Sequence, residues 1–152
     1  PTLSPFNAWV LLKGLETLKL RVEAQSRAAA AVAEALASTK GVERIYYPHH
    51  DTHAQVKLAR GQMKMGGTMV SFDVAGGKAK AFDVLRKLGI IDISNNLGDA
   101  KSLITHPATT THRNIGPEAR AMMGITDGNL RLSVGLEDVD DLVGDLRQAL
   151  KP

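Results

Sequence analysis

One arginine in the middle of an alternating segment is the residue whose type and position most clearly suggest chemistry. The segment Asn129 to Val134, NLRLSV, predicts a strand with Arg131 and Ser133 on one face and three apolar side chains on the other. The planar guanidinium of arginine matches the two oxygens of a carboxylate. An arginine at such a position usually faces solvent, so the pattern leaves two interpretations open, a carboxylate clamp and a solvated surface residue.

A second candidate is the stretch from Asn95 to His112, in which a histidine stands on either side of a Pro-Ala-Thr-Thr-Thr run. His106 and His112 could hold a metal ion, form an acid–base pair or shape a loop. They lie on the two sides of Pro107 without the regular spacing that would aim both rings at one ion. We therefore expect both histidines to shape the loop, and we assign no metal ligand in this chain.

A third candidate is the cluster His49, His50, Asp51 and His53, which combines imidazole and carboxylate ligands that transition metals bind. The alternative is a polar surface loop. No helix is predicted to fix these side chains in place, so we expect the surface loop rather than a metal site.

The composition excludes several classes of function. With 152 residues, 43% of them hydrophobic, the chain has the size of one globular domain. It contains no cysteine, which excludes disulfides and thiolate chemistry and leads us to expect the cytoplasm. Its 19 basic residues are dispersed among 16 acidic ones, so we expect no nucleic-acid partner. No apolar run reaches the ~18 residues of a membrane-spanning helix, so we expect a soluble protein without a membrane partner.

Hydrophobic periodicity and turn residues predict the order of the elements. From Ser4 to about Ala37 we expect a short helix, a break at Gly14 and a long helix that Thr17 could cap. The other expected elements are strands Val42–Tyr47, Thr68–Val74, Ile90–Ser94 and Asn129–Val134, and helices within Gln55–Met63 and Lys78–Leu88, from Pro117, and after Asp138. This order predicts an α/β fold, an α+β two-layer sandwich, with helices packed on one face of a small, mainly antiparallel sheet of about four strands.

Three segments of the chain, in order, resemble one family of enzymes. They are LSPFNAWVLLKGLETLKLR (Leu3 to Arg21), SNNLGDAKSLITHPATTTH (Ser94 to His112) and LRLSVGLED (Leu130 to Asp138). Together they resemble the C-terminal part of the cystathionine gamma-synthase family of pyridoxal-phosphate enzymes. The resemblance implies that residues 1–152 form the single C-terminal domain of a fold-type I enzyme and that the cofactor-binding domain is absent from this chain. The abrupt start PTLSPF also leads us to expect a longer protein.

The resemblance implies roles for individual residues. The arginine of the family's RLSVG motif binds the α-carboxylate of the substrate, which gives that role to Arg131. Many members have a serine before the LG pair; here Asn96 stands there, and its amide could still donate a hydrogen bond. Thr111 lines the same pocket in relatives. Pyridoxal phosphate and the lysine that holds it belong to the missing N-terminal domain, so no catalytic or cofactor-binding residue is implied in this chain.

The resemblance also implies a substrate class. The residues SPFNAW and the pair Asn95-Asn96 are most similar to members that replace the succinyl group of O-succinylhomoserine with sulfide, on the way to methionine. The implied partners are an O-acylhomoserine, sulfide, the protein's own N-terminal domain and further copies in a homotetramer. Cystathionine gamma-synthase and methionine gamma-lyase activities are alternatives within the family. A non-catalytic amino-acid-binding module and a structural oligomerisation domain are alternatives outside it.

Overall fold

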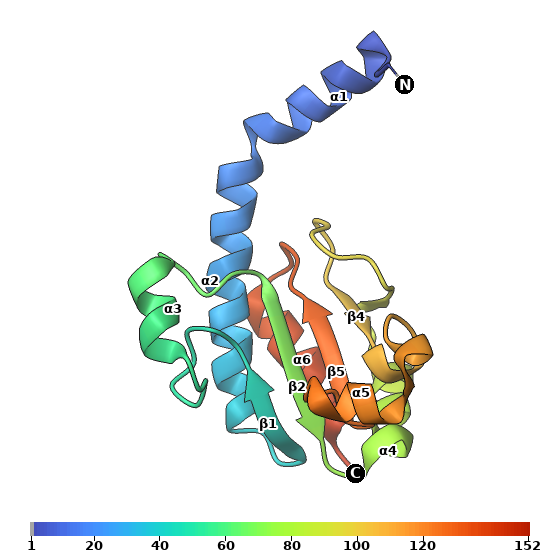
Figure 1. The fold of residues 1–152 in the computed structure, drawn as a ribbon. Helices are drawn as coiled ribbons and strands as arrows, with labels where there is room; N and C mark the ends of the chain where they lie inside the picture. Colours follow the sequence, from blue (N-terminus) through green and yellow to red (C-terminus); the bar gives the residue numbers. More distant parts are fainter. Residues whose placement is uncertain (1) are drawn as a thin grey trace.

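The computed structural model describes residues 2–152 and contains a five-stranded sheet with helices packed against it (Figure 1). The strands lie in the order β1-β2-β5-β4-β3, and neighbours are antiparallel except for the parallel pair β3 and β4. The strands are β1 Val42–Tyr46, β2 Met69–Val74, β3 Asp92–Ile93, β4 Leu103–Thr105 and β5 Asn129–Ser133. The helices are α1 Pro5–Glu16, α2 Leu18–Ala37, α3 Val56–Gln62, α4 Gly77–Lys87, α5 Gly116–Met122 and α6 Val139–Leu150, with short 3₁₀ turns at Pro107–Thr109 and Arg113–Ile115.

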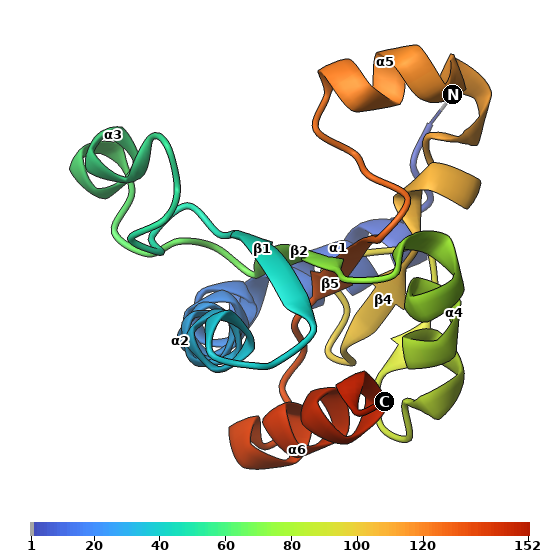
Figure 2. The same ribbon diagram turned by 90° about the horizontal axis from the view of Figure 1, so that it is seen from below.

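Helices α2, α4 and α6 cover one face of the sheet, and α5 lies on the opposite side (Figure 2). The covered face is apolar: Val70, Ile104, Leu130 and Leu132 are completely buried. In β5 the two leucines alternate with polar residues, as a half-buried sheet requires. Burial of this face between sheet and helices is the main source of hydrophobic stabilisation in the domain.

The structure confirms the predicted fold class and corrects several details. β4 was not predicted, because its three residues carry no alternation; all of them are buried. Gly14 does not interrupt the first helix, which continues to Glu16, and the break falls at Thr17 instead. The Thr17 side chain makes no capping hydrogen bond to α2; its hydroxyl accepts a hydrogen bond from Arg21 Nε at 3.2 Å.

The strand expected over Ile90–Ser94 is reduced to two residues by a carboxylate from α6. Asp145 accepts hydrogen bonds from the backbone N–H groups of Gly89 (2.8 Å), Ile90 (2.9 Å) and Ile91 (3.2 Å). Those amides are therefore unavailable to a strand ladder. Burial of the carboxyl opposes its ionisation, but the three backbone donors outweigh burial, and the pKa of Asp145 is lowered.

Helix α1 projects away from the rest of the molecule at the end of α2 (Figure 1), and none of its residues is buried. It nevertheless carries large apolar side chains, at Phe6, Trp9, Leu11, Leu12 and Leu15. A helix that is apolar on several sides is normally covered by other parts of a protein. No helix within residues 2–152 is long and apolar enough to span a membrane.

Candidate functional site

The open face of the sheet carries a row of polar side chains across four strands. Tyr46 on β1 pairs with Ser71 on β2, Ser71 pairs with Arg131 on β5, and Arg131 pairs with Thr105 on β4. Residues directly opposite each other in antiparallel strands point to the same side of the sheet. Arg131 therefore lies at the centre of a polar row, on the face that α2, α4 and α6 leave uncovered.

Arg131 faces away from the core, as the alternation in β5 predicts, and is half-buried. Its Nη2 donates a hydrogen bond to the backbone carbonyl of Asn95 at 2.8 Å. Within the described part of the chain no ion pair involves Arg131. A guanidinium has five N–H donors, so this single contact orients the fork and leaves other donors for an incoming anion.

Asn95 is the residue that joins Arg131 to the loop between β3 and β4. Its side-chain oxygen accepts a hydrogen bond from Thr105 Oγ1 at 2.8 Å, and the same hydroxyl lies 2.9 Å from Thr110 Oγ1. Thr105 itself is buried. The backbone of Asn95 thus contacts the arginine while its side chain is held by β4. The sequence analysis did not predict this bridging role of Asn95. It becomes apparent only when the register of β4 and β5 places Thr105 beside Arg131.

Asn96 lies next to this contact and is exposed. Its backbone N–H donates to Ser94 Oγ at 3.2 Å, and its side-chain amide has no hydrogen bond to any other described residue. The structure therefore places the Asn96 backbone one residue from the carbonyl that Arg131 contacts. The free amide supplies a donor of the kind that a carboxylate accepts.

Thr111 makes no hydrogen bond to Arg131 among the described residues, and its predicted place in the substrate pocket stays a prediction. It is exposed, and its hydroxyl lies 2.8 Å from Nδ1 of the adjacent His112. Its neighbour Thr110, not Thr111, reaches the Thr105 hydroxyl and so joins the network around Asn95. The structure brings Arg131 and the loop carrying Asn96 together, and no hydrogen bond joins Thr111 to either of them.

His106 is fastened inside the loop by both of its ring nitrogens. Nε2 lies 2.8 Å from the carbonyl of Asp127, which can only accept, so Nε2 carries the proton. In the neutral ring Nδ1 then accepts from Thr109 Oγ1 at 2.9 Å. Phe82 packs against the imidazole with a centroid separation of 5.2 Å. The side chain therefore links the 3₁₀ turn after β4 to the turn before β5, which is a loop-shaping arrangement.

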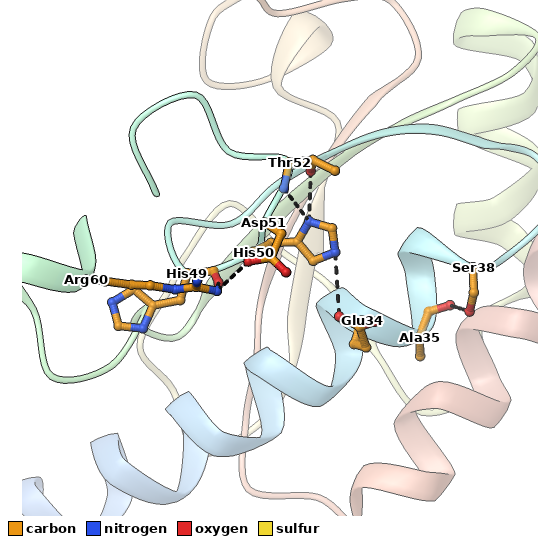
Figure 3. Close-up of polar contacts among 8 residues, drawn as sticks. All are labelled: Glu34, Ala35, Ser38, His49, His50, Asp51, Thr52 and Arg60. Carbon is orange, nitrogen blue, oxygen red and sulfur yellow. Dashed lines mark hydrogen bonds and ion pairs between the residues drawn. The ribbon is translucent and has the colours of Figure 1, made fainter. Parts of the chain in front are cut away.

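The histidine cluster after β1 is held by separate local contacts (Figure 3). His50 Nε2 faces Glu34 on α2, 3.6 Å from a carboxylate oxygen. Arg60 donates from Nη2 to the backbone carbonyl of His49 and to the Asp51 carboxylate, both at 2.7 Å. Within residues 2–152 no group of three such side chains is arranged to hold a metal ion. The four side chains therefore have different local partners, and the assignment of no metal ligand to this loop stays a prediction.

Comparison with known proteins gives consistent matches over the whole chain. A family model described as "Cys/Met metabolism PLP-dependent enzyme" matches residues 1–151. O-succinylhomoserine sulfhydrylase from Mycobacterium tuberculosis is 56% identical over 156 residues, which cover 99% of this chain and 38% of that protein. O-succinylhomoserine sulfhydrylase from Pseudomonas aeruginosa is 50% identical over 150 residues, which cover 99% of this chain and 37% of that protein.

A solved structure shares the fold. Cystathionine gamma synthase from Xanthomonas oryzae pv. oryzae, in complex with cystathionine, superposes with a TM-score of 0.91 at 42% sequence identity. The superposition covers 98% of this chain and 38% of the other. The chain thus spans well under half the length of each of these relatives.

Proposed function

The chain belongs to the family of pyridoxal-phosphate-dependent enzymes of cysteine and methionine metabolism, and from this premise we propose that the full-length protein is an O-succinylhomoserine sulfhydrylase. It would convert O-succinylhomoserine and sulfide to homocysteine and succinate, on the way to methionine. The identities of 56% and 50% to two enzymes of that name support this choice. In this proposal residues 1–152 are the C-terminal domain, and this domain alone is inactive.

The role of the domain is to bind the α-carboxylate of the amino-acid substrate. Arg131 supplies the guanidinium, and Asn96 and Thr111 supply further donors. The observation that carries this proposal is the position of Arg131: a single hydrogen bond to Asn95 O orients it on the uncovered face, and no carboxylate of the described residues neutralises it. A fixed carboxylate also fixes which bonds of the substrate's α-carbon face the cofactor, so the clamp contributes orientation.

The described residues do not fit the covalent attachment of pyridoxal phosphate. A lysine that holds this cofactor needs an enclosed site that lowers its pKa, and none of the lysines within residues 2–152 is buried. When bound, the cofactor supplies an electron sink for the substrate's α-carbon. We therefore assign its binding to the N-terminal domain and assign to this chain only the substrate side of the site.

Helix α1 is the surface through which this domain meets the rest of the assembly. Its exposed apolar side chains, Phe6 (69% exposed) and Trp9 (55%) among them, have no cover within the described residues. The relatives are more than twice as long as this chain, so a larger body is available to cover them. We assign the cover to the N-terminal domain and to further copies in a homotetramer.

Replacing Arg131 in the full-length enzyme tests the proposal. In Arg131→Ala we expect the KM for O-succinylhomoserine to rise by about 30-fold or more, because a truncated charge pair costs ~2–5 kcal/mol. The KM for sulfide should change little. Arg86→Ala is the matched control, since Arg86 is exposed on α4 on the other side of the sheet. An unchanged KM for the amino-acid substrate in Arg131→Ala would rule out the clamp.

A second candidate activity is cystathionine formation, supported by the superposition on cystathionine gamma synthase at 42% identity. The two activities differ in the sulfur donor, sulfide or cysteine. Assaying the full-length protein with O-succinylhomoserine and O-acetylhomoserine, each with sulfide and with cysteine, separates them. The pair with the highest kcat/KM identifies the activity; methionine cleavage exceeding all four replacement rates would indicate a lyase instead.

A further inference from the structure

The loop 94–101, which carries Asn95 and Asn96, is fastened at its far end by several hydrogen bonds, and one carboxylate accepts two bonds where the loop enters β4. We propose that Glu137, which follows β5, is a positioning residue that sets the placement of this loop against Arg131 and thereby the affinity for the substrate carboxylate. This inference rests on the proposed role of Arg131. Glu137 itself need not touch the substrate, because it acts through Ser102 and the loop.

Glu137 accepts two hydrogen bonds from one residue. Its Oε1 accepts from the backbone N–H of Ser102 at 2.6 Å, and its Oε2 accepts from the Ser102 hydroxyl at 2.7 Å. The same hydroxyl accepts from the backbone N–H of Gly135 at 2.8 Å. Ser102 is fully buried, at 0% exposure. We call these three bonds the Ser102–Glu137 clasp; it closes where the loop enters β4.

The chain at the clasp is packed too closely for a side chain on Gly135. A Cβ there would overlap the backbone nitrogen of Ser102, the carbonyl oxygen of Ala100 and the Glu137 carboxylate. The N–H of Leu136 donates to Ala100 O at 2.7 Å, which adds a backbone bond at the same crossing. The segment after β5 therefore packs directly against the backbone at the end of the loop.

The loop is attached to β5 along its length as well. Gly98 N–H donates to Ser133 Oγ at 2.9 Å, and Asn95 O accepts from Arg131. The order of contacts is the same on both segments: Arg131 meets the start of the loop, Ser133 its middle and Glu137 its end. A shift at the clasp is therefore passed along the loop to the carbonyl that orients Arg131.

An ionised Glu137 carboxylate would hold Ser102 more firmly than a neutral acceptor. Hydrogen bonds to an ionised acceptor are shorter and about twice as strong as neutral ones. Within residues 2–152 no basic side chain forms an ion pair with Glu137. Among the described residues its hydrogen-bond donors are the N–H and the hydroxyl of Ser102, so truncating Glu137 removes both bonds.

The test uses the full-length enzyme with Glu137→Gln, Glu137→Ala and Ser102→Ala. Gln keeps an acceptor for the Ser102 N–H but loses the charge, so we expect the KM for the amino-acid substrate to rise by about tenfold for Ala and by less for Gln. Ser102→Ala removes the two bonds of the hydroxyl but keeps the backbone N–H donor, so it weakens the clasp and should resemble Glu137→Gln. kcat and the visible absorbance of the bound cofactor should stay unchanged. Glu43→Gln, an exposed acid on β1, is the control.

Two measurements separate positioning from a merely structural role. Binding of an amino acid should weaken in the Glu137 variants, while binding of the matched amine without the carboxylate should not. Combining Glu137→Ala with Arg131→Ala should add no further loss, because the clasp acts through the arginine. Equal losses for both ligands, or full additivity with Arg131→Ala, would overturn the inference. If Arg131→Ala alone has no effect, the proposed function fails instead, so the two failures are distinguishable.

Discussion

The two faces of β5 differ in what their residues contact. Leu130 and Leu132 lie on one face, completely buried under the helices. Arg131 and Ser133, one residue away, lie on the other face and hold the loop 94–101 through Asn95 O and Gly98 N–H. One strand thus serves the core and the site at once, because its side chains alternate.

The side chains on the two faces of β5 contribute to different properties of the protein. Side chains on the helix-covered face stabilise the domain through apolar contact, where the loss of atoms leaves a cavity. Side chains on the open face form hydrogen bonds with a loop that has no regular structure over most of its length. Substitutions on the two faces should therefore change different quantities, stability on one and substrate affinity on the other.

The largest expected effect on stability is on the covered face. Leu132→Ala in the full-length enzyme should lower the free energy of unfolding by ~2–5 kcal/mol, since the side chain is fully buried. The KM of the folded fraction should remain near that of the parent. Thermal unfolding and steady-state kinetics measure the two quantities. Ile93→Ala, at an exposed residue of β3, is the control; an equal loss there would contradict the assignment of the loss to burial.

The next effect concerns Asp145, a polar residue on the helix side. Because its pKa is lowered in the folded state, its contribution to stability is present above its unfolded pKa and is lost as pH falls through the folded value. Asp145→Asn should cost ~1.5–3 kcal/mol near neutral pH, since hydrogen bonds to a charged group are lost. The variant should also show a weaker loss of stability on acidification. Unfolding midpoints from neutral pH to pH ~3 test this; parallel curves would contradict it.

A smaller effect is expected at Asn96 on the open face. Asn96→Ala should raise the KM for the amino-acid substrate by about three- to tenfold, because one neutral donor to the carboxylate is lost. Asn96→Ser should stay close to the parent, since a hydroxyl can donate in its place. Kinetics of the three proteins decide this. If the serine variant resembled alanine, the loop would place residue 96 differently from the serine-bearing relatives.

The smallest effect is expected at Thr111. Its hydroxyl already contacts His112, so Thr111→Val should raise the KM by no more than about twofold. Thr110→Val, which removes a contact of the Thr105 hydroxyl, should have the larger effect. The KM for the amino-acid substrate, measured for both variants, tests this order. A larger effect at Thr111 would show that its hydroxyl points toward the substrate in the full-length protein.

The sequence was sufficient for features that depend on local pattern. Alternation in NLRLSV predicted that Arg131 leaves the core, and Asp138 caps α6 as expected, accepting from Asp140 N–H at 2.9 Å. Helix and strand positions were largely right, because periodicity reports which side of an element is buried. The roles of Arg131, Asn96 and Thr111 toward a substrate stay predictions.

Features that depend on contacts between distant segments could not be predicted. The role of Asn95 requires the pairing of β4 with β5, and the clasp requires Ser102 and Glu137 to meet across 35 positions of sequence. The shortened β3 follows from Asp145, more than 50 residues away in the chain. No local pattern records such partners, since each residue alone is compatible with an exposed loop.

The pairing of Ser71, Arg131 and Thr105 has a consequence for the fidelity of folding. A slip of β5 by one residue would turn every side chain of the strand to the opposite face. The guanidinium would then enter the apolar layer without a partner, and two leucines would face outward, at a cost of several kcal/mol. A sheet with this register slip is therefore strongly disfavoured. Formation of the apolar core and the orientation of Arg131 toward the open face depend on the same strand register, so a molecule with a correct core also has Arg131 on the correct face.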